Sequence, residues 1–245
     1  MKRALALTLL MTMTGLAGCP QDFRPVGFNM SDFFQFANGR TWVYSTLTAD
    51  VDYVIDATMD PAIQVELENG DTATVIHYEK RCIDGVEECG AGFLFDLYMS
   101  EDAVQGVMVN GYETPEKGKV VFTNPLRLAK SKMSRGDDIV STEVDGHTFT
   151  TTFFDMEKDG TIDVDGEPID EILGCDQDVG VEWECVHLVV ESDPPGHWLA
   201  GDWWASPGWG LVAWKRTDDV DKWRTIDARV YEGGGDTGST DDTDQ

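Results

Sequence analysis

The densest group of potential metal ligands in the sequence is a run of acidic residues that begins at position 155. Asp155, Glu157, Asp159 and Asp163 alternate with other residues, and Gly160 follows the third of them. Hard cations such as Ca²⁺ need several carboxylate and carbonyl oxygens that converge from one turn, and this spacing matches the first half of a calcium-binding loop. The sequence therefore offers one candidate metal site.

The second half of this segment favours a simpler interpretation. The twelfth loop position holds Gly166 where calcium loops place a bidentate glutamate, and Glu167 follows one residue late. The preceding run from Thr148 to Phe154 has the composition of a strand, whereas a helix leads into a standard calcium loop. We expect a hairpin that turns at Asp159-Gly160 with solvated acids on its arms, and at most weak binding of calcium.

Six tryptophans crowd the stretch from residue 198 to residue 223. Exposed indole rings stack on sugar faces and on apolar ligands, and Asp202 beside them is suited to binding hydroxyl groups. Because neighbouring side chains of a strand point to opposite faces, we expect one of Trp203 and Trp204 to be exposed. Trp203, Trp204 and Trp209 are the candidate ligand-stacking residues; the alternative is that these rings belong to the core.

Catalytic chemistry has little support in the sequence. The four histidines lack the paired spacing of a metalloprotease or a deaminase, and neither a Gly-x-Ser-x-Gly elbow nor a glycine-rich phosphate loop occurs. We expect no catalytic residues and a protein that is not an enzyme.

The first nineteen residues have the layout of an export signal. An apolar run from Ala4 to Met13 follows a basic start, and small residues precede Cys19. The block Leu16-Ala17-Gly18-Cys19 resembles the lipobox of bacterial lipoproteins. In that family the signal peptide, here residues 1–18, is removed, and the cysteine, here Cys19, carries fatty acyl chains such as palmitate.

This resemblance implies that the protein is attached to a membrane, and it implies which membrane. Three acyl chains anchor a protein stably without a membrane-spanning helix. Pro20 stands where many lipoproteins retained at the inner membrane have Asp, so the resemblance implies an outer-membrane lipoprotein that faces the periplasm or the cell surface. An ordinary secretory signal that happens to contain a cysteine is the alternative.

Four cysteines remain if Cys19 carries lipid, namely Cys82, Cys89, Cys175 and Cys185. An even number in an exported protein favours disulfides. Of the three possible pairings we expect Cys82 with Cys89 and Cys175 with Cys185, because each pair flanks a short acidic loop that contains glycine. A four-thiolate zinc site is the alternative, although neither pair has the short spacing of common zinc sites.

The chain is strongly acidic. Its formal charge is −28, and loss of residues 1–18 would remove Lys2 and Arg3 but no acid. Nucleic acids and anionic lipids would repel such a chain, so we expect no nucleic-acid partner, whereas divalent cations and basic partners would be attracted. Solubility and repulsion between crowded copies explain the charge more simply.

The pattern of the remaining sequence predicts strands. Short runs rich in Val, Ile, Thr and aromatic residues recur about every ten residues between turn residues, and Asn69-Gly70 is a strong hairpin signal. With 41% apolar residues the chain can bury a core. We expect an all-β fold: a curved antiparallel meander, either a sandwich or a partly open barrel, with few short helical turns, at residues 31–37 and 124–132.

Composition also divides the chain. We expect a tether at residues 19–30, a β-rich domain at residues 31–232 and an acidic tail at residues 233–245. The tail opens with three glycines and then has no apolar residue, so we expect it to be disordered.

Three sequence blocks together resemble a widespread set of uncharacterised, β-rich bacterial envelope lipoproteins. They are the aromatic segment Phe33 to Phe36 with Gly39-Arg40-Thr41-Trp42-Val43-Tyr44, the segment Trp183 to Val186, and Trp203-Trp204-Ala205 with Gly208-Trp209-Gly210-Leu211-Val212. That set has Pro-Leu where this chain has Gln35-Phe36, and Val where it has Trp209. The resemblance implies an exported β domain without known catalysis and supplies no active-site residues. We expect Gly208 and Gly210 to bracket a turn with close backbone approach.

These observations lead to three functional hypotheses. The first is a lipid-anchored envelope protein that acts as a non-enzymatic binding or structural module, with a protein, a glycan or an apolar molecule as partner. The second is a carrier that encloses lipid or another apolar ligand in a curved sheet. The third is calcium-assisted glycan binding. A filled core and an open apolar cavity would separate the first two.

Overall fold

The computed structural model describes residues 27–34, 39–46, 53–68, 70–83, 86, 89–157, 162–164, 167–169, 185–216 and 222–230. Within these residues the fold consists of antiparallel strands and one 3-10 turn, η1 (Met30–Asp32). The prediction of an all-β fold is confirmed. No helix in this part of the chain is long and apolar enough to span a membrane.

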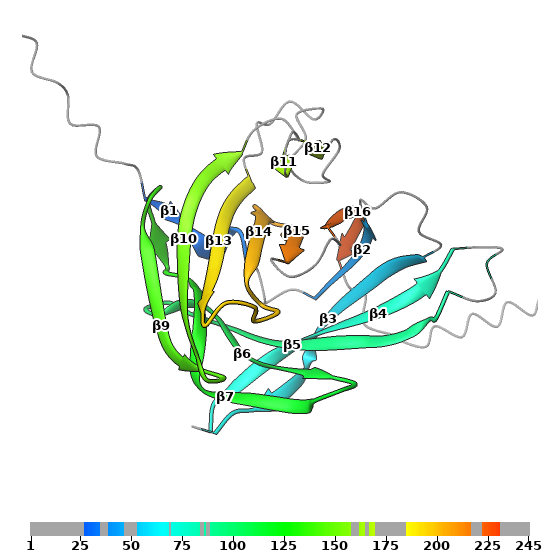
Figure 1. The fold of residues 1–245 in the computed structure, drawn as a ribbon, viewed down its shortest axis with the longest axis horizontal. Helices are drawn as coiled ribbons and strands as arrows, with labels where there is room; N and C mark the ends of the chain where they lie inside the picture. Colours follow the sequence, from blue (N-terminus) through cyan, green and yellow to red (C-terminus); the bar gives the residue numbers. More distant parts are fainter. Residues whose placement is uncertain are drawn as a thin grey trace, which may run out of the picture.

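Twelve strands form one continuous antiparallel sheet (Figure 1). From edge to edge its order is β7 (Gly118–Ala129), β6 (Gly106–Thr114), β5 (Gly92–Asp102), β4 (Thr72–Cys82), β3 (Tyr53–Glu66), β2 (Arg40–Thr46), β16 (Lys222–Val230), β15 (Gly210–Arg216), β14 (Gly201–Ser206), β13 (Cys185–Asp193), β10 (His147–Glu157) and β9 (Asp138–Val144). The sheet therefore has two meandering halves, β2 to β7 and β9 to β16, which are joined where β2 pairs with β16.

The sheet curves so strongly that its two edge strands, β7 and β9, pack against each other. Side-chain hydrogen bonds link this region: the backbone N–H of Arg127 donates to Ser141 Oγ at 2.9 Å, and Lys130 Nζ donates to the carbonyl of Asp138 at 3.2 Å. No backbone ladder joins β7 to β9, both of which are described in full. The result is an open, folded-over sheet, as the predicted curved meander requires.

Two short ladders flank the main sheet. β1 (Phe28–Asn29) pairs with β8 (Lys132–Met133), and β11 (Ile162–Val164) pairs with β12 (Glu167–Ile169). Because β1 and the buried Met30 belong to the fold, the folded body begins before residue 31, and residues 28–30 are not part of a tether. The predicted signal peptide, Cys19 and the acidic tail lie outside the described residues.

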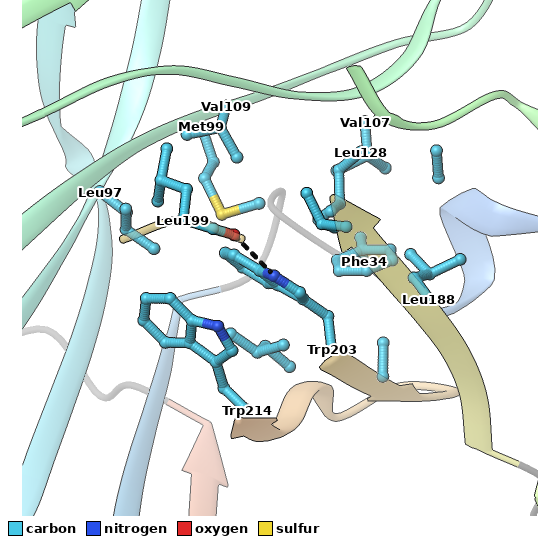
Figure 2. Packing of buried hydrophobic residues seen from close by; sticks show 14 of the residues in the cluster. Phe34, Leu97, Met99, Val107, Val109, Leu128, Leu188, Leu199, Trp203 and Trp214 are labelled. Carbon is cyan, nitrogen blue, oxygen red and sulfur yellow. Dashed lines mark hydrogen bonds between the residues drawn. The ribbon is translucent and has the colours of Figure 1, made fainter. Parts of the chain in front are cut away.

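Side chains fill the space between the two halves of the sheet (Figure 2). Leu97, Met99 and Val109 from β5 and β6 pack in one cluster with Trp203 and Trp214 from β14 and β15, and all five are almost completely buried. Trp203 Nε1 also donates a hydrogen bond to the carbonyl of Leu199 at 3.2 Å. Burial of apolar area on this scale, at about 25 cal/mol per Å², is the main stabilising contribution to such a fold.

One local prediction is wrong. Residues 124–132 do not form a helical turn, because residues 118–129 continue as β7. Pro125 is tolerated there since β7 is an edge strand, and its pairing with β6 is irregular between Val121 and Leu126. β3 and β4, the strands on either side of the predicted hairpin, are paired antiparallel with Glu66 opposite Thr72.

Candidate functional site

An open pocket of about 500 Å³ lies where one end of strands β3 to β6 meets β15 and the segment before β14. We call it the aromatic–basic pocket. Its apolar and aromatic lining residues are Tyr53, Ile55, Leu94, Phe95 and Trp198, and its polar and charged ones are Lys80, Thr114, Glu116, Lys117 and Arg216.

A disulfide holds this end of the sheet together. Cys82, the last residue of β4, is bonded to Cys89, which lies just before β5, with a Cα–Cα distance of 5.5 Å. Cys82 also pairs with Tyr53, the first residue of β3. The predicted Cys82–Cys89 pairing is confirmed, and a disulfide sulfur cannot act as a zinc thiolate. Cys185 is disulfide-bonded too, whereas Cys175 lies outside the described residues.

Two cations that line the pocket lie over aromatic rings that also line it. Lys80 Nζ is 3.8 Å from the centroid of the Tyr53 ring, and Arg216 Cζ is 5.8 Å from the centroid of Trp198. Such contacts contribute about 0.5–1 kcal/mol each at exposed sites. They also restrict where a flexible side chain places its charge, so the positive groups are oriented before any ligand arrives.

Arg216 reaches the pocket because β14 and β15 approach closely beside it. Gly201 pairs with Arg216, and a Cβ atom on Gly201 would lie 2.0 Å from the carbonyl oxygen of Lys215. The φ angle of Gly201 is +146°, which L side chains rarely adopt. A glycine is therefore required at this position for the observed pairing.

Trp198 forms a rigid part of the pocket floor. Its ring contacts Phe95 edge-to-face at 5.1 Å, Tyr112 edge-to-face at 5.0 Å and Trp214 in a tilted arrangement at 5.8 Å. The buried indole Nε1 has no hydrogen-bond partner among the described residues. These contacts connect the pocket floor directly to the main core.

A chain of hydrogen bonds fixes the segment that carries Trp198. Lys117 Nζ donates to Tyr112 Oη at 3.0 Å, Tyr112 Oη donates to Asp145 Oδ2 at 2.8 Å, and His197 Nε2 lies 3.2 Å from the same carboxylate oxygen. Since the backbone N–H of Leu199 donates to His197 Nδ1, the ring proton is on Nε2 and is donated to Asp145. Both ring nitrogens of His197 are therefore occupied.

The protonation states in this network follow from burial and from these bonds. Burial lowers the pKa of His197, and the charges of His147 and Lys117 act in the same direction. Burial alone would raise the pKa of Asp145, but hydrogen bonds from Tyr112 and His197 and the charge of Lys117 hold it below its usual value. Because the hydrogen bond with Tyr112 raises the pKa of Lys117, the lysine is charged at neutral pH.

The candidate stacking tryptophans lie elsewhere. Trp203 and Trp204 point to opposite faces of β14, but they are only 0% and 1% exposed, so the expectation that one of them is exposed is wrong. Trp203 packs in the main core, and Trp204 stacks on His187 with a centroid distance of 4.5 Å. Trp209 is half-buried, with the guanidinium of Arg40 over its ring at 5.8 Å, and its ligand role stays a prediction.

Two of the sequence blocks contact each other although they are far apart in the chain. Trp42 Nε1 donates to the carbonyl of Trp209, and Tyr44 Oη donates to the carbonyl of Leu211, both at 2.7 Å. Gly208 and Gly210 have φ angles of +76° and +79°, and a Cβ on Gly210 would lie 3.2 Å from the Trp42 ring. The expected close approach is confirmed, and these blocks stabilise the fold.

The predicted calcium segment is only partly described. Asp155 forms an ion pair with Arg135 at 2.7 Å. Glu157 ends β10 and Asp163 lies in β11, while Asp159 falls outside the described residues. The strand pair in this region is β11 with β12, connected by residues 165–166. Among the described side chains, no three His, Cys, Asp or Glu residues are grouped closely enough to hold a metal ion, and the calcium site stays a prediction.

A second open pocket, of about 410 Å³, lies at the opposite ends of β4 and β5 and extends over β6 and β7. We call it the acidic pocket, because the charged residues among its described lining are all carboxylates: Glu68, Asp71, Glu101 and Asp102. These groups also serve local structure, since Asp102 accepts hydrogen bonds from the backbone N–H groups of Val104 and Gln105.

Sequence reasoning did not identify the aromatic–basic pocket. Its three cations, Lys80, Lys117 and Arg216, come from different strands and turns, so no short motif contains them. Trp198 belongs to the tryptophan-rich stretch but has no strand pattern that would distinguish it from its neighbours. The one available signal was the presence of cations near aromatic residues in a chain with only 18 basic residues.

No protein-family model, curated protein or solved structure matches this chain significantly.

Proposed function

We propose that this protein is an exported envelope protein, anchored by acyl chains on Cys19 at the outer membrane, which binds a small ligand in the aromatic–basic pocket and is not an enzyme. The anchor is proposed from the Leu-Ala-Gly-Cys block of the sequence. The binding role is proposed from the pocket.

The observation that carries the binding role is the convergence of aromatic and charged side chains on one pre-formed concave site. The disulfide, the ring contacts of Trp198 and the hydrogen bonds of Asp145 hold the lining residues in place. Ligand sites are typically concave and largely apolar, with a few converging polar groups that orient the ligand. The pocket has this composition and needs no rearrangement to admit a ligand.

The filled core supports this role over that of a carrier that encloses its ligand. An enclosed lipid would need the space between the two halves of the sheet, which Leu97, Met99, Trp203 and Trp214 occupy. Removal of such packed side chains costs several kcal/mol each.

The contacts of two histidine–carboxylate pairs, His197 with Asp145 and His187 with Asp202, support a non-catalytic role. Both ring nitrogens of His197 bind protein groups, and Asp145 receives hydrogen bonds from both Tyr112 and His197. The pair thus fastens the segment that carries Trp198. His187 is buried, bonds Asp202 at 2.8 Å and stacks on Trp204, which is a packing arrangement.

The anchor is tested by the mass and the location of the mature protein. We expect a chain that begins at Cys19 and carries acyl chains, and we expect Cys19→Ser to release it from the membrane fraction. A mature protein that begins at another residue, or an unmodified Cys19, would contradict this part of the proposal.

Binding is tested by a ligand-observed NMR screen of small fragments against the full mature protein. Leu94→Trp fills the pocket from β5, and Val104→Trp, at a position that is 80% exposed outside the pocket, is the matched control. We expect fragments whose binding is lost in Leu94→Trp and retained in Val104→Trp. The absence of hits, or equal binding to both variants, would overturn the proposal.

A further inference from the structure

We infer that the aromatic–basic pocket selects an anion, namely a carboxylate or phosphate group attached to a ring or to a short acyl chain. This inference rests on the proposed binding function of the pocket and adds the chemical class of its ligand.

The sign of the charge at the pocket favours an anion. The whole chain has 46 acidic and 18 basic residues, so a surface patch of average composition is acidic, as in the acidic pocket. Among the described residues, the lining of the aromatic–basic pocket has the opposite ratio, with three cations and one carboxylate, that of Glu116. A local positive site in a negative protein attracts an anion at short range against the net charge.

The two lysines of the pocket are placed to donate hydrogen bonds to an anion. Lys80 stands opposite Ile55 of β3, which is buried, so its stem leaves the sheet on the inner face at the pocket mouth. Its ammonium group is held over Tyr53 at 3.8 Å. Lys117 is positioned by its hydrogen bond to Tyr112 and by an ion pair with Asp145, in which Nζ lies 3.8 Å from Oδ2. Each ammonium group has three donors, so both keep hydrogen bonds to offer to an anion.

An apolar surface lies beneath these charges. Ile55, Leu94, Phe95 and Trp198 come from β3, β5 and the segment before β14 and form the floor. A bare inorganic anion would leave this apolar surface exposed to water, whereas an anion with a ring or an acyl chain would cover it. The cavity volume of about 500 Å³ falls within the range of roughly 300–1,000 Å³ that is usual for small-molecule sites.

The inference is tested by calorimetric titration of the full mature protein with matched probes. Glucose, glucuronate and glucose 6-phosphate share one sugar ring, and octanol and octanoate share one alkyl chain. Because a charge-assisted hydrogen bond is stronger than a neutral one, we expect at least one anionic probe to bind about tenfold more tightly than its neutral partner. We also expect this preference to shrink as the salt concentration is raised about tenfold. The probe that binds identifies whether the body is a sugar ring or an acyl chain.

Charge-removing variants separate the pocket from the rest of the surface. Lys80→Met removes the charge, keeps an unbranched side chain of nearly the same length and does not touch the Asp145 network, so we expect a folded protein whose affinity for the preferred anion falls about tenfold. We expect the Lys80→Met/Lys117→Met double variant to lose the anion preference, and Glu116→Gln to bind the anion more tightly. Lys119→Met is the matched control, since Lys119 lies 5.8 Å from the Tyr98 ring centroid but does not line the pocket.

The two proposals fail in different ways. If neutral and anionic probes bind equally, or if Lys119→Met weakens anion binding as much as Lys80→Met, the inference of anion selectivity is wrong while the binding function stands. If none of these probes binds but the fragment screen yields hits that Leu94→Trp abolishes, the inference also fails and the binding function again stands. If the fragment screen yields no hits, both the binding function and the inference of anion selectivity are wrong.

Discussion

The aromatic–basic pocket and the acidic pocket lie at opposite ends of β4 and β5, yet they differ in the sign of their charge and in what holds the charged groups. In the acidic pocket, carboxylates bind nearby protein groups: hydrogen bonds from Gln105 and Val104 lower the pKa of Asp102, and Thr123 Oγ1 donates to Glu68. In the aromatic–basic pocket, aromatic rings hold the ammonium of Lys80 and the guanidinium of Arg216.

The composition of the chain explains the acidic pocket but not the cations of the aromatic–basic pocket. A chain of net charge −28 produces acidic patches by composition alone, and such patches keep a protein soluble. A cluster of cations over aromatic rings is the opposite of what such a composition produces on average. The structure assembles it from residues that lie between positions 53 and 216 of the sequence.

The largest expected effect comes from the floor of the aromatic–basic pocket. Because Trp198 packs on Phe95, Tyr112 and Trp214, we expect Trp198→Ala to lower the free energy of unfolding by about 3 kcal/mol, at the lower end of the range for buried aromatic residues. Urea denaturation followed by circular dichroism measures this. A loss near zero would mean that the ring does not join the pocket to the core.

The disulfide should have the next largest effect. A loop of this length, with a sequence separation of 7 between Cys82 and Cys89, gives a stabilisation of about 2.5 kcal/mol from the restricted unfolded chain. We therefore expect the Cys82→Ala/Cys89→Ala double variant to unfold at lower urea concentration and to bind pocket ligands more weakly. If stability falls but affinity is unchanged, the disulfide does not pre-organise the pocket.

Acid should weaken the end of the molecule that holds Trp198. Since the pKa of His197 is lowered in the folded state by burial, the unfolded state binds more protons between that lowered value and the ordinary value of about 6.5. The free energy of unfolding should therefore fall as the pH drops below about 7. Asp145, Lys117, Tyr112 and His147 also face this ring.

The pH effect is checked by stability curves of wild type and His197→Gln between neutral and mildly acidic pH. The variant keeps a donor and an acceptor but cannot titrate, so its curve should be flatter. Asp145 acts at lower pH: its folded pKa is depressed, so its contribution is present above about pH 4 and is lost as the pH falls through the folded value. Parallel curves for wild type and variant above pH 5 would refute the role of His197.

The smallest effect is expected in the acidic pocket. Glu101→Gln removes one of its exposed carboxylates, and because surface substitutions away from special features change stability by at most about 0.5 kcal/mol, we expect little change. Binding of anionic probes should also be unaffected. A large gain in anion affinity would show that the two pockets are coupled electrostatically, and that their charges cannot be treated separately.

Several features could be predicted because their causes are local in the sequence. The β-rich runs and turn residues predict the strands, and a spacing of seven residues around an acidic, glycine-containing loop predicts the Cys82–Cys89 disulfide. Gly208 and Gly210 have the positive φ angles expected of a turn with close backbone approach. The alternation of side chains along a strand, the closure of a short loop and the sterics of a turn each act over a few residues. A short stretch of sequence is therefore enough to predict each of these features.

Other features depend on partners that are distant in the chain. Residues 124–129 are a strand because β6 supplies backbone partners, although their own composition allows a helical turn. Trp203 and Trp204 are both buried, Trp203 in the main core and Trp204 against His187, which strand alternation alone does not reveal.

The sequence by itself determined the fold class, the Cys82–Cys89 disulfide and the excess of acidic residues. Only the tertiary structure decided which tryptophan would border a pocket and which cations would surround it. Lys80, Lys117, Trp198 and Arg216 meet only once the two halves of the sheet fold over each other. The physical reason is that charge and packing act through space, and the curvature of the sheet sets those distances.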